Sequence, residues 1–343
     1  MHWNPLDKLV EECAFSGVVR VRRHGQTIYE RATGFADRAN SIANTAETRF
    51  GIASGTKLLT ALTVGRLIDA GRLALTTRLR DCISVELPDY SAAITIQHLL
   101  THTSGIPDYY DEELIADFDN FTVGIPWYEL RGPKDYLPVF PQRETKFAPG
   151  EGFSYCNSGY ILLGVVVEEI TGKRFQDVVA EEILGPARMD RSGFFAMNQL
   201  PEGTALGYIE DGESWRTNIY NLPIVGASDG GLFSTLADIA ALWDGFWNGE
   251  IVSEELVRTF SAPFSNVSGD TGLHYGHGMW IRRRADGTLQ HYIMGADPGI
   301  SCKSAVDCQR QLDYAVLSNT SEGAWPIARA IDDVLGKEDG IPS

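Results

Sequence analysis

Residues 51–62 read GIASGTKLLTAL, and this stretch decides both the expected fold and the expected chemistry. Ser54 stands three residues before Lys57, and an apolar run with helical spacing follows. The pattern predicts a helix from Ser54 to Ala70, with Gly71 as its stop. Positions i and i+3 share one face of a helix, so the serine hydroxyl and the lysine amine are expected to meet.

Ser54 has two interpretations, a helix cap and a nucleophile. Serine is favoured at helix starts, and an S-x-x-K match arises by chance about once in a few hundred residues. A serine hydroxyl is a weak nucleophile that needs a neighbouring base. A buried lysine loses its proton more readily than an exposed one, so Lys57 could accept the hydroxyl proton. The N–H of Ser54 at the helix start could help to hold an oxyanion.

A second motif, Tyr155-Cys156-Asn157, precedes an apolar helix that is expected over residues 157–171, with Gly172 as its stop. A tyrosine beside a lysine can relay a proton, and the Asn157 amide can orient the lysine or bind a substrate carbonyl. By itself this motif also fits a half-buried core tyrosine and a helix cap. The two motifs together, each at the head of an apolar helix, are far more specific.

Ser228 is the competing nucleophile, because residues 226–230, GASDG, match G-x-S-x-G. That motif has meaning only where a strand leads through a sharp turn directly into a helix. Here GGLFST follows, and no helix can start at once. We therefore expect a glycine-rich turn at Ser228 and prefer Ser54 as the nucleophile.

Composition excludes several classes of partner. The chain has 343 residues, 43% of them hydrophobic, and a formal net charge of -17. This charge disfavours nucleic acid, whose phosphates need a basic face, and an anionic membrane surface. No apolar run is long enough to span a bilayer, and residues 1–13 do not resemble a signal peptide. A cytoplasmic protein is expected, unless a leader was removed.

Cysteine and histidine placement indicates no cofactor and no metal site. The seven histidines are dispersed, without H-E-x-x-H, and no cluster has zinc-ligand spacing. The odd number of cysteines and the absence of C-x-x-C favour reduced thiols over a disulfide framework. The five cysteines are Cys13, Cys82, Cys156, Cys302 and Cys308.

Strand patterns gather at both ends of the chain, with helices and long loops between them. Hairpins are expected to turn at His24-Gly25 and around residues 285–287. We expect a single two-lobed catalytic domain over residues 1–343. Its α/β lobe comprises residues 1–65 and 200–343, and its mainly helical lobe comprises residues 66–199. Residues 108–145, rich in acidic, aromatic and proline residues, are either a surface excursion or a wall over an active site.

Four segments together resemble the serine β-lactamase and penicillin-binding protein superfamily. The resemblance covers nearly the whole chain, and it is strongest to class C β-lactamases, low-molecular-weight DD-peptidases and family VIII esterases. It implies an α+β, β-lactamase/transpeptidase-like fold, in which helices flank an antiparallel sheet and a mainly helical lobe is inserted. The segments are GIASGTKLLTAL (51–62), ITIQHLLTHTSGIPDY (94–109), FAPGEGFSYCNSGYILLGVVVEEITG (147–172) and GGLFSTLADIAALW (230–243).

The resemblance also implies site residues. Ser54 matches the nucleophile, Lys57 the motif lysine, and Tyr155 with Asn157 the second motif. These residues imply a mechanism in which an acyl group is carried on Ser54.

The third family motif, Lys-Thr-Gly or His-x-Gly, falls on Ile293-Met294-Gly295, where the cation is replaced by isoleucine. An isoleucine cannot pair with a substrate carboxylate. His291, on the same strand face, either substitutes for the cation or is a surface strand residue. Gly295 still permits close approach, and the N–H of Ala296 is expected to complete an oxyanion hole with that of Ser54.

The expected function is a serine hydrolase that forms an acyl-enzyme on Ser54. Lys57 and Tyr155 share base and acid work, Asn157 orients the substrate, and water releases the acyl group. The missing cation favours a small neutral ester or amide, and acidic residues 108–119 would repel anions if they line the cleft. The alternatives are a DD-peptidase (carboxypeptidase) acting on a peptide, a weak β-lactamase, or a non-catalytic penicillin-recognising protein. The oligomeric state stays open.

Overall fold

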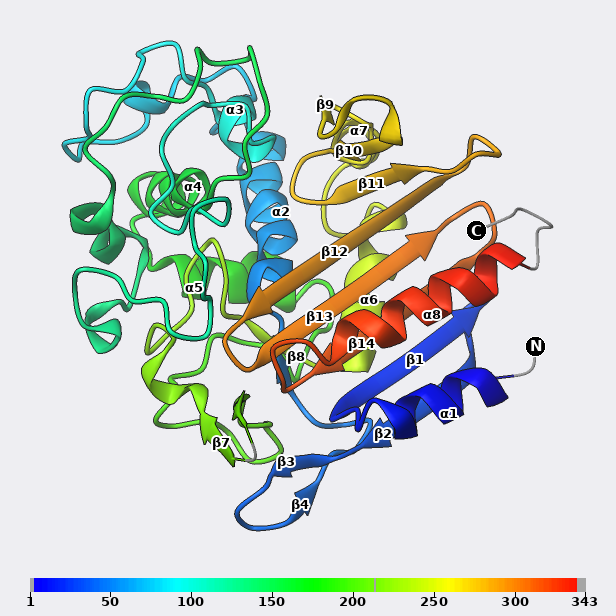
Figure 1. The fold of residues 1–343 in the computed structure, drawn as a ribbon. Coiled ribbons are helices and arrows are strands. Elements are labelled where there is room, and N and C mark those ends of the chain that lie inside the picture. The colour runs from blue at the N-terminus through cyan, green and yellow to red at the C-terminus, as the bar shows by residue number, and fades with distance from the viewer. Residues whose placement is uncertain (1–2, 213, 338–343) are drawn as a thin grey trace.

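The computed structural model describes residues 3–212 and 214–337, and its largest element is an eight-stranded antiparallel sheet (Figure 1). The first hairpin turns at His24-Gly25, as predicted, and both residues have positive φ, 50° and 72°. The hairpin predicted around residues 285–287 is also present, between β11 (Trp280–Arg283) and β12 (Leu289–Asp297). The strand order across the sheet is β2 (Gln26–Thr33), β1 (Gly17–Arg23), β14 (Leu312–Ser318), β13 (Ile300–Asp307), β12 (Leu289–Asp297), β11 (Trp280–Arg283), β10 (Leu273–Tyr275) and β9 (Ser265–Asn266).

Strands from the two ends of the chain are neighbours in this sheet. β1 pairs with β14 along its whole length, from Gly17 opposite Ser318 to Arg23 opposite Leu312. The pattern of strands at both ends of the sequence is explained by this pairing, because each end supplies part of one sheet.

Two helices cover one face of the sheet, α1 (Asn4–Glu12) and α8 (Ala324–Lys337) (Figure 1). α1 buries Leu6 and Val10, which are four residues apart and therefore share one helical face. They belong to one apolar cluster with Ile331 of α8 and with residues of β1 and β14. The apolar face of α1 is thus buried against elements from the other end of the chain.

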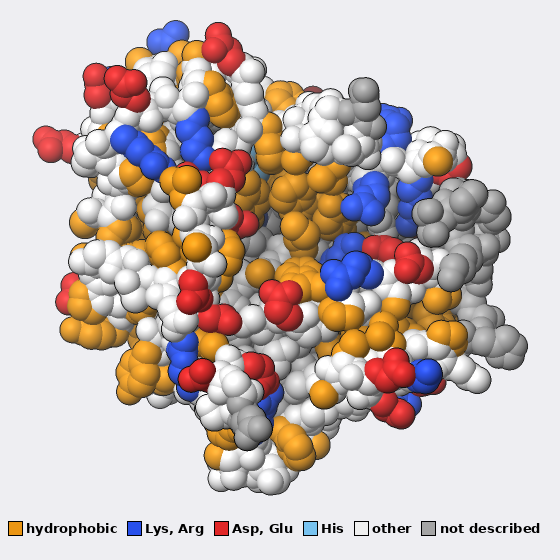
Figure 2. Space-filling model, viewed as in Figure 1, with side chains coloured by type: hydrophobic (Ala, Val, Ile, Leu, Met, Phe, Trp, Pro, Cys, Tyr) orange, Lys and Arg blue, Asp and Glu red, His pale blue; other side chains and the backbone are white. Residues whose placement is uncertain are grey.

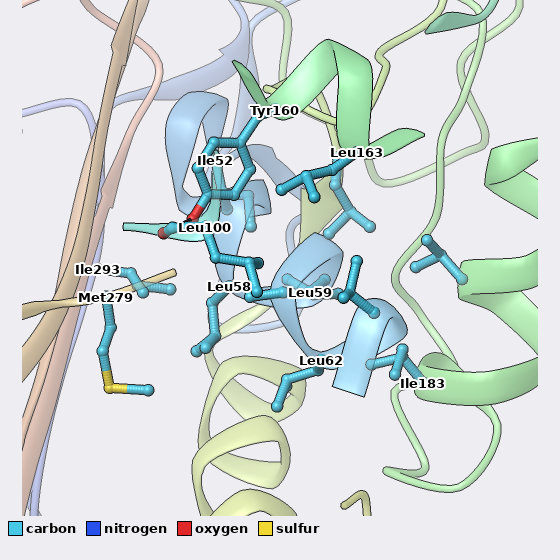
Figure 3. Packing of buried hydrophobic residues seen from close by; sticks show 14 of the residues in the cluster. Ile52, Leu58, Leu59, Leu62, Leu100, Tyr160, Leu163, Ile183, Met279 and Ile293 are labelled. Atoms are coloured by element: carbon cyan, nitrogen blue, oxygen red, sulfur yellow. Dashed lines mark hydrogen bonds between the residues drawn. The ribbon is translucent and has the colours of Figure 1, made fainter. Parts of the chain in front are cut away.

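The opposite face of the sheet packs on α6 (Leu236–Trp247) and, beyond it, on α2 (Thr56–Asp69). α2 is buried on nearly all sides, as expected of a helix in the middle of a core. Figure 3 shows its Leu58, Leu59 and Leu62 among apolar side chains of the sheet and of neighbouring helices. Burial of each such leucine contributes roughly 1.5–3 kcal/mol. The position of the amino-terminal end of α2 is therefore tightly held.

The remaining helices gather mainly beside α2, on the left of Figure 1. The predicted helix over residues 157–171 is α4 (Asn157–Thr171), and Gly172 ends it with a φ of 72°. It contacts α2, α3 (Ile96–Leu100) and α5 (Phe175–Val179). The other short elements are α3 (Ile96–Leu100), α5 (Phe175–Val179), α7 (Glu254–Phe260) and the strand pairs β3 (Phe35–Asp37) with β4 (Ile42–Ala43), β5 (Phe50–Gly51) with β8 (Phe233–Ser234), and β6 (Tyr208–Asp211) with β7 (Ser214–Thr217).

This architecture confirms the predicted α+β class with an antiparallel sheet flanked by helices. The lobe limits at residues 65 and 200 stay a prediction. Within residues 3–212 and 214–337, no helix combines the length and the apolar character needed to cross a bilayer.

Candidate active site

Ser54 lies in a 3-10 turn, Ala53–Gly55, that leads directly into α2. The helix begins at Thr56, two residues later than predicted, because residues 53–55 form the tighter 3-10 turn, in which the N–H of Gly55 bonds to the Ile52 carbonyl at 2.8 Å. The Thr56 hydroxyl holds the turn: it donates to the Ala53 carbonyl at 2.7 Å and accepts from the N–H of Leu232 at 3.1 Å. The side chain of Ser54 caps neither the turn nor α2.

Lys57 is 1% exposed, and its amine makes three hydrogen bonds. It donates to the hydroxyl oxygen of Ser54 at 2.9 Å, to Oδ1 of Asn157 at 2.7 Å and to the main-chain oxygen of Asp229 at 2.6 Å. Burial lowers the pKa of Lys57, although the Asp229 carboxylate and others nearby oppose this shift. The predicted meeting of Ser54 and Lys57 is therefore present, with an amine that gives up its proton more readily than an exposed one.

Tyr155 lies on the other side of Ser54 and forms a hydrogen bond with it. Its ring stacks on Trp280, with 5.7 Å between ring centroids, and lies 4.3 Å from the ring of His102. Burial raises the pKa of Tyr155 well above its ordinary value. The phenol therefore keeps its proton, which suits a proton donor better than a phenolate base.

Asn157 is oriented by Asp108, a buried carboxylate that sequence reasoning did not single out. Asp108 accepts hydrogen bonds from the N–H of Asn157 at 2.7 Å, from its Nδ2 at 3.0 Å and from the N–H of Ser158 at 2.9 Å. Nδ2 also donates to the Tyr110 carbonyl at 3.1 Å. Both amide hydrogens are thus engaged, and Oδ1 is left to accept from Lys57.

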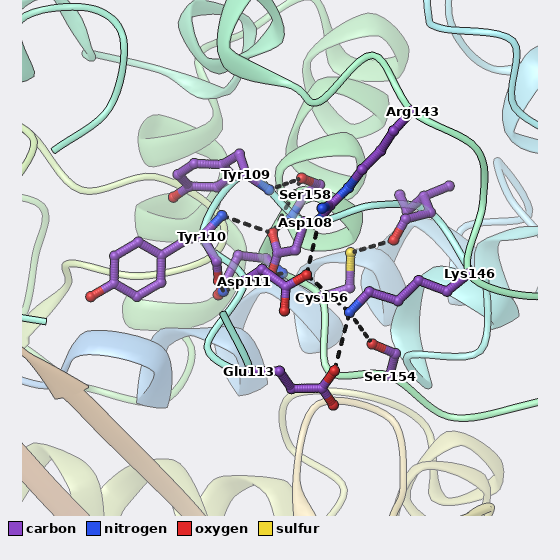
Figure 4. Close-up of polar contacts among 12 residues, drawn as sticks. Asp108, Tyr109, Tyr110, Asp111, Glu113, Arg143, Lys146, Ser154, Cys156 and Ser158 are labelled. Carbon is purple, nitrogen blue, oxygen red and sulfur yellow. Dashed lines mark hydrogen bonds and ion pairs between the residues drawn. The ribbon is translucent and has the colours of Figure 1, made fainter. Parts of the chain in front are cut away.

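The acidic segment after Asp108 is anchored by two cations (Figure 4). Asp111 forms ion pairs with Arg143 at 3.0 Å and with Lys146 at 3.1 Å. Lys146 also lies 3.5 Å from Glu113 and donates to the Ser154 hydroxyl at 2.9 Å. These contacts tie the segment to the chain that leads into α4.

Gly295 of β12 lies directly against the turn that contains Ser54. A Cβ at this position would lie 2.3 Å from the carbonyl oxygen of Ile52 and 2.7 Å from the main-chain nitrogen of Ser54. Only glycine allows β12 to approach this closely. The predicted close approach is thus present, and Ala296, the next residue, lines the same cavities as Ser54.

Neither Ile293, at the position of the motif cation, nor His291, its possible substitute, lines the cavities at Ser54. Ile293 is 3% exposed and packs in the core near Leu58 and Met279 (Figure 3). His291 is 6% exposed, shares a hydrogen bond with the Ser261 carbonyl at 2.9 Å, and lies in none of the cavity walls at Ser54. Both interpretations of His291 were therefore wrong, because this strand is covered on both faces and the side chain turns into the interior.

Ser228 is fully buried, and its hydroxyl has no partner in the described part of the chain. It lies so close to α4 that a Cβ at Gly164 would be 2.2 Å from its oxygen. The expected turn is present, with the N–H of Ala227 bonded to the carbonyl of Gly230 at 2.9 Å. This segment contributes to the site through the main-chain carbonyl of Asp229, which accepts a hydrogen bond from Lys57.

Two cavities open beside Ser54, with volumes of about 70 and 410 Å³. Residues 108–145 form part of both walls through Tyr110, Glu112 and Phe118, so this segment is a wall of the site. Figure 2 shows acidic side chains around the hollow on this face. Of the other predicted site residues, Asn157 lines the smaller cavity, Tyr155 and Gly295 line the larger, and Ala296 lines both.

Sequence reasoning missed the carboxylates of Glu112 and Asp297, which line both cavities with Ser54. Burial raises the pKa of Asp297 to about 7, and the nearby charge of Asp229 adds to this shift. The acidic residues 108–119 were expected to repel anions only if they line the cleft, and nothing in the sequence pointed to Asp297 beyond its position after Ala296. In the described part of the chain, no group of three or more His, Cys, Asp or Glu side chains is arranged to hold a metal ion.

Known proteins match this chain along most of its length. The family profile described as Beta-lactamase matches residues 6–335. Penicillin-binding protein 4* of Bacillus subtilis (strain 168) is 27% identical over 335 residues, which cover 92% of this chain and 70% of that protein. Esterase EstB of Burkholderia gladioli is 35% identical over 214 residues, or 60% of this chain and 53% of the esterase. The crystal structure of a penicillin binding protein from Bacillus halodurans superposes with a TM-score of 0.90 and 40% identity, over 96% of this chain and 99% of that one.

Proposed function

The chain belongs to the beta-lactamase family, and we propose that it is a serine hydrolase that forms an acyl-enzyme on Ser54 and cleaves small esters or amides. The observation that carries this proposal is the contact of 2.9 Å between the Ser54 hydroxyl and a Lys57 amine whose pKa is lowered by burial. A weak nucleophile thus has a base within reach, at the wall of a cavity.

Acylation follows from these positions. Neutral Lys57 takes the proton of Ser54 as the hydroxyl oxygen attacks the substrate carbonyl. The N–H groups of Ser54 and Ala296 receive the oxyanion. Tyr155 gives its proton to the leaving group and regains one from the Lys57 ammonium. Water then releases the acyl group by the same steps in reverse.

The substrate preference follows from the cavity walls. No Lys, Arg or His is found among the described residues that line either cavity. The position of the family's motif cation holds Ile293, which packs in the core. A substrate carboxylate would therefore find no partner there, and a substrate without one is favoured. The resemblance to Esterase EstB supports an ester.

A DD-peptidase or weak β-lactamase is the second candidate. It is favoured by the match to penicillin-binding proteins over more than nine-tenths of the chain. A non-catalytic penicillin-recognising protein is the third. It is disfavoured because Ser54, Lys57 and Tyr155 are all present and in contact.

The test compares a short-chain nitrophenyl ester with a fluorescent penicillin. We expect ester turnover that is abolished in Ser54→Ala and retained in Ser228→Ala, the matched serine that lines neither cavity. Mass spectrometry of the denatured enzyme should show one acyl group on Ser54. Turnover that survives Ser54→Ala would overturn the proposal. Penicillin labelling of Ser54 without ester turnover would favour the second candidate.

A further inference from the structure

We propose that the cleft beside Ser54 selects substrates that carry an ammonium group, and that the carboxylates of Asp297 and Glu112 receive it. This inference rests on the proposed function and narrows its substrates to esters or amides of amino acids with a free amino group. The cleft itself is identified as a ligand site independently, by the Ser54–Lys57 contact at its wall.

Asp297 ends β12 and directly follows Ala296, the expected oxyanion donor. It lines both cavities with Ser54, yet no described residue donates a hydrogen bond to its carboxylate or forms an ion pair with it. A partly buried carboxylate without a partner is costly to keep charged. A cation on the substrate, close to the carbonyl under attack, would supply that partner.

Glu112, from the segment after Asp108, lines the same two cavities. Its two neighbours along the chain are compensated elsewhere: Asp111 pairs with Arg143 and Lys146, and Glu113 lies 3.5 Å from Lys146. Glu113 lines neither cavity. Arg143 and Lys146 are therefore used away from the cleft, whereas Glu112, which shares a hydrogen bond with Asn157, pairs with neither of them.

Lys57 does not neutralise these charges fully. Its three hydrogen bonds go to Ser54, Asn157 and the main chain of Asp229, and none goes to Glu112 or Asp297. Asp117, Asp119 and Glu322 add further negative charge to the wall of the larger cavity. The field in the cleft thus attracts cations and repels anions.

The walls also contain two polar atoms that have no protein partner among the described residues. The hydroxyl of Tyr110, which lines both cavities, and the indole N–H of Trp127, which lines the smaller, have no partner among the described atoms. Figure 4 shows the Tyr110 hydroxyl directed away from the polar contacts of Asp108. Buried polar atoms without partners in a cavity wall are typical of a site that a ligand completes.

The chemistry of an ammonium group fits this combination. It has three N–H donors and no acceptor, so it suits a cleft lined by carboxylates that have no ion-pair partner in the described part of the chain. The aromatic rings of the same walls can stabilise the cation through their faces and pack on the rest of the substrate. The aromatic side chains of the smaller cavity are Tyr109, Tyr110, Phe118, Phe121, Trp127, Tyr136, Phe195 and Phe233.

The test compares two nitrophenyl esters of one amino acid, one with a free amine and one N-acetylated. We expect kcat/KM to be at least tenfold higher for the free amine, a ratio that corresponds to about 1.4 kcal/mol. Asp297→Asn and Glu112→Gln should each lower this ratio several-fold, mainly by raising KM for the free amine. Glu113→Gln, the matched control on the same loop, should leave the ratio unchanged.

Other outcomes separate this inference from the proposed function. Equal or faster turnover of the acetylated ester, lost in Ser54→Ala, would overturn ammonium selection and leave the hydrolase intact. Turnover of neither ester, or turnover that survives Ser54→Ala, would overturn the function itself. If Asp297→Asn does not fold, two other measurements still test the inference. One is the ratio for Glu112→Gln, and the other compares inhibition of ester turnover by 2-phenylethylammonium with inhibition by 2-phenylethanol. Equal inhibition by these two compounds, or inhibition by sodium ions at the same concentration, would contradict the inference.

Discussion

The carboxylate of Asp108 accepts a hydrogen bond from the side-chain nitrogen of Asn157 at 3.0 Å, and this contact determines which end of the amide faces Lys57. The oxygen end then lies 2.7 Å from the lysine nitrogen. A residue that lines neither cavity at Ser54 therefore orients the amide that contacts Lys57.

Replacing Asp108 by Asn is expected to lower kcat about 10–100-fold, because a small displacement of a positioned group is costly to catalysis. The Asp108 charge raises the pKa of Lys57, so its loss should also shift the acid limb of the kcat/KM profile to lower pH. Steady-state kinetics across pH check both effects. A fall in melting temperature with an unchanged kcat and pH profile would show a structural role only. Asp111→Asn, which breaks ion pairs outside the cavities, is the control.

Deprotonation of Lys57 should govern acylation. Burial lowers the pKa of Lys57, so the fraction of neutral amine, and with it kcat/KM, should rise with pH at values below the ordinary 10.5 of lysine. Lys57→Arg keeps the charge but cannot supply a neutral base, and we expect a loss of about 10²–10⁴-fold in kcat. Stopped-flow measurement of the acylation burst checks this. An arginine variant with near-normal acylation would exclude Lys57 as the base.

Gly295→Ala should displace the nucleophile turn, because the added methyl group would lie 2.3 Å from the Ile52 carbonyl oxygen. We expect kcat to fall about 100-fold or more and stability to fall by about 1–3 kcal/mol. Ester kinetics and urea unfolding measure the two effects. Gly124→Ala, where an added Cβ meets nothing within 4 Å, should change neither.

Ammonium selection should depend on pH through Asp297. Its pKa is raised to about 7 by burial and by the charges of Asp229 and Glu112, with Lys57 opposing. The free-amine preference should therefore increase as pH rises through 7, where Asp297 becomes charged. It should decrease again as the substrate amine loses its proton, near about 8 for an α-amino group. The ratio of kcat/KM for the free and acetylated esters measures this, and a ratio that is flat between pH 5 and 8 would contradict it.

Restoring the family lysine by Ile293→Lys should destabilise the protein and not improve penicillin turnover. Ile293 is 3% exposed among apolar neighbours, and a buried charge without a partner costs roughly 3–5 kcal/mol. Ile293→Val should cost only about 0.5–1.5 kcal/mol. Chemical denaturation and a chromogenic penicillin provide the measurements. A stable Ile293→Lys variant that hydrolyses penicillin would show that this strand can turn its side chain toward the site.

Site residues that lie a few positions apart in the chain could be predicted from local sequence patterns. Lys57 is three residues from Ser54 and Asn157 is two residues from Tyr155, so their spacing and the helices behind them were visible in the sequence. Gly295 was found by its distance from a turn motif, and the structure supplies the physical reason in the contact with the Ile52 carbonyl.

Contacts between distant segments were not predictable in the same way. Asp108 caps a helix that begins 49 positions later, and no periodicity links the two. The alternation of side chains along a strand placed His291 and Ile293 on the same face of β12. Both faces of this strand are largely covered, so the pattern of polar and apolar residues could not show which face meets the cavity. Which acidic side chains face inward depends on where Arg143 and Lys146 lie, and only the three-dimensional arrangement shows this.

The pairing of β1 with β14 has a consequence for biosynthesis. During translation β1 can pair with β2 at once, but its other edge stays open until residues 312–318 leave the ribosome. The apolar side of α1 likewise stays uncovered until α8 has been synthesised. All residues between β1 and β14 are therefore made before β1 is paired on both edges, and an unpaired edge of this kind is prone to aggregation. Ribosome-bound chains that are stalled before β14 should accordingly recruit chaperones at their amino-terminal hairpin.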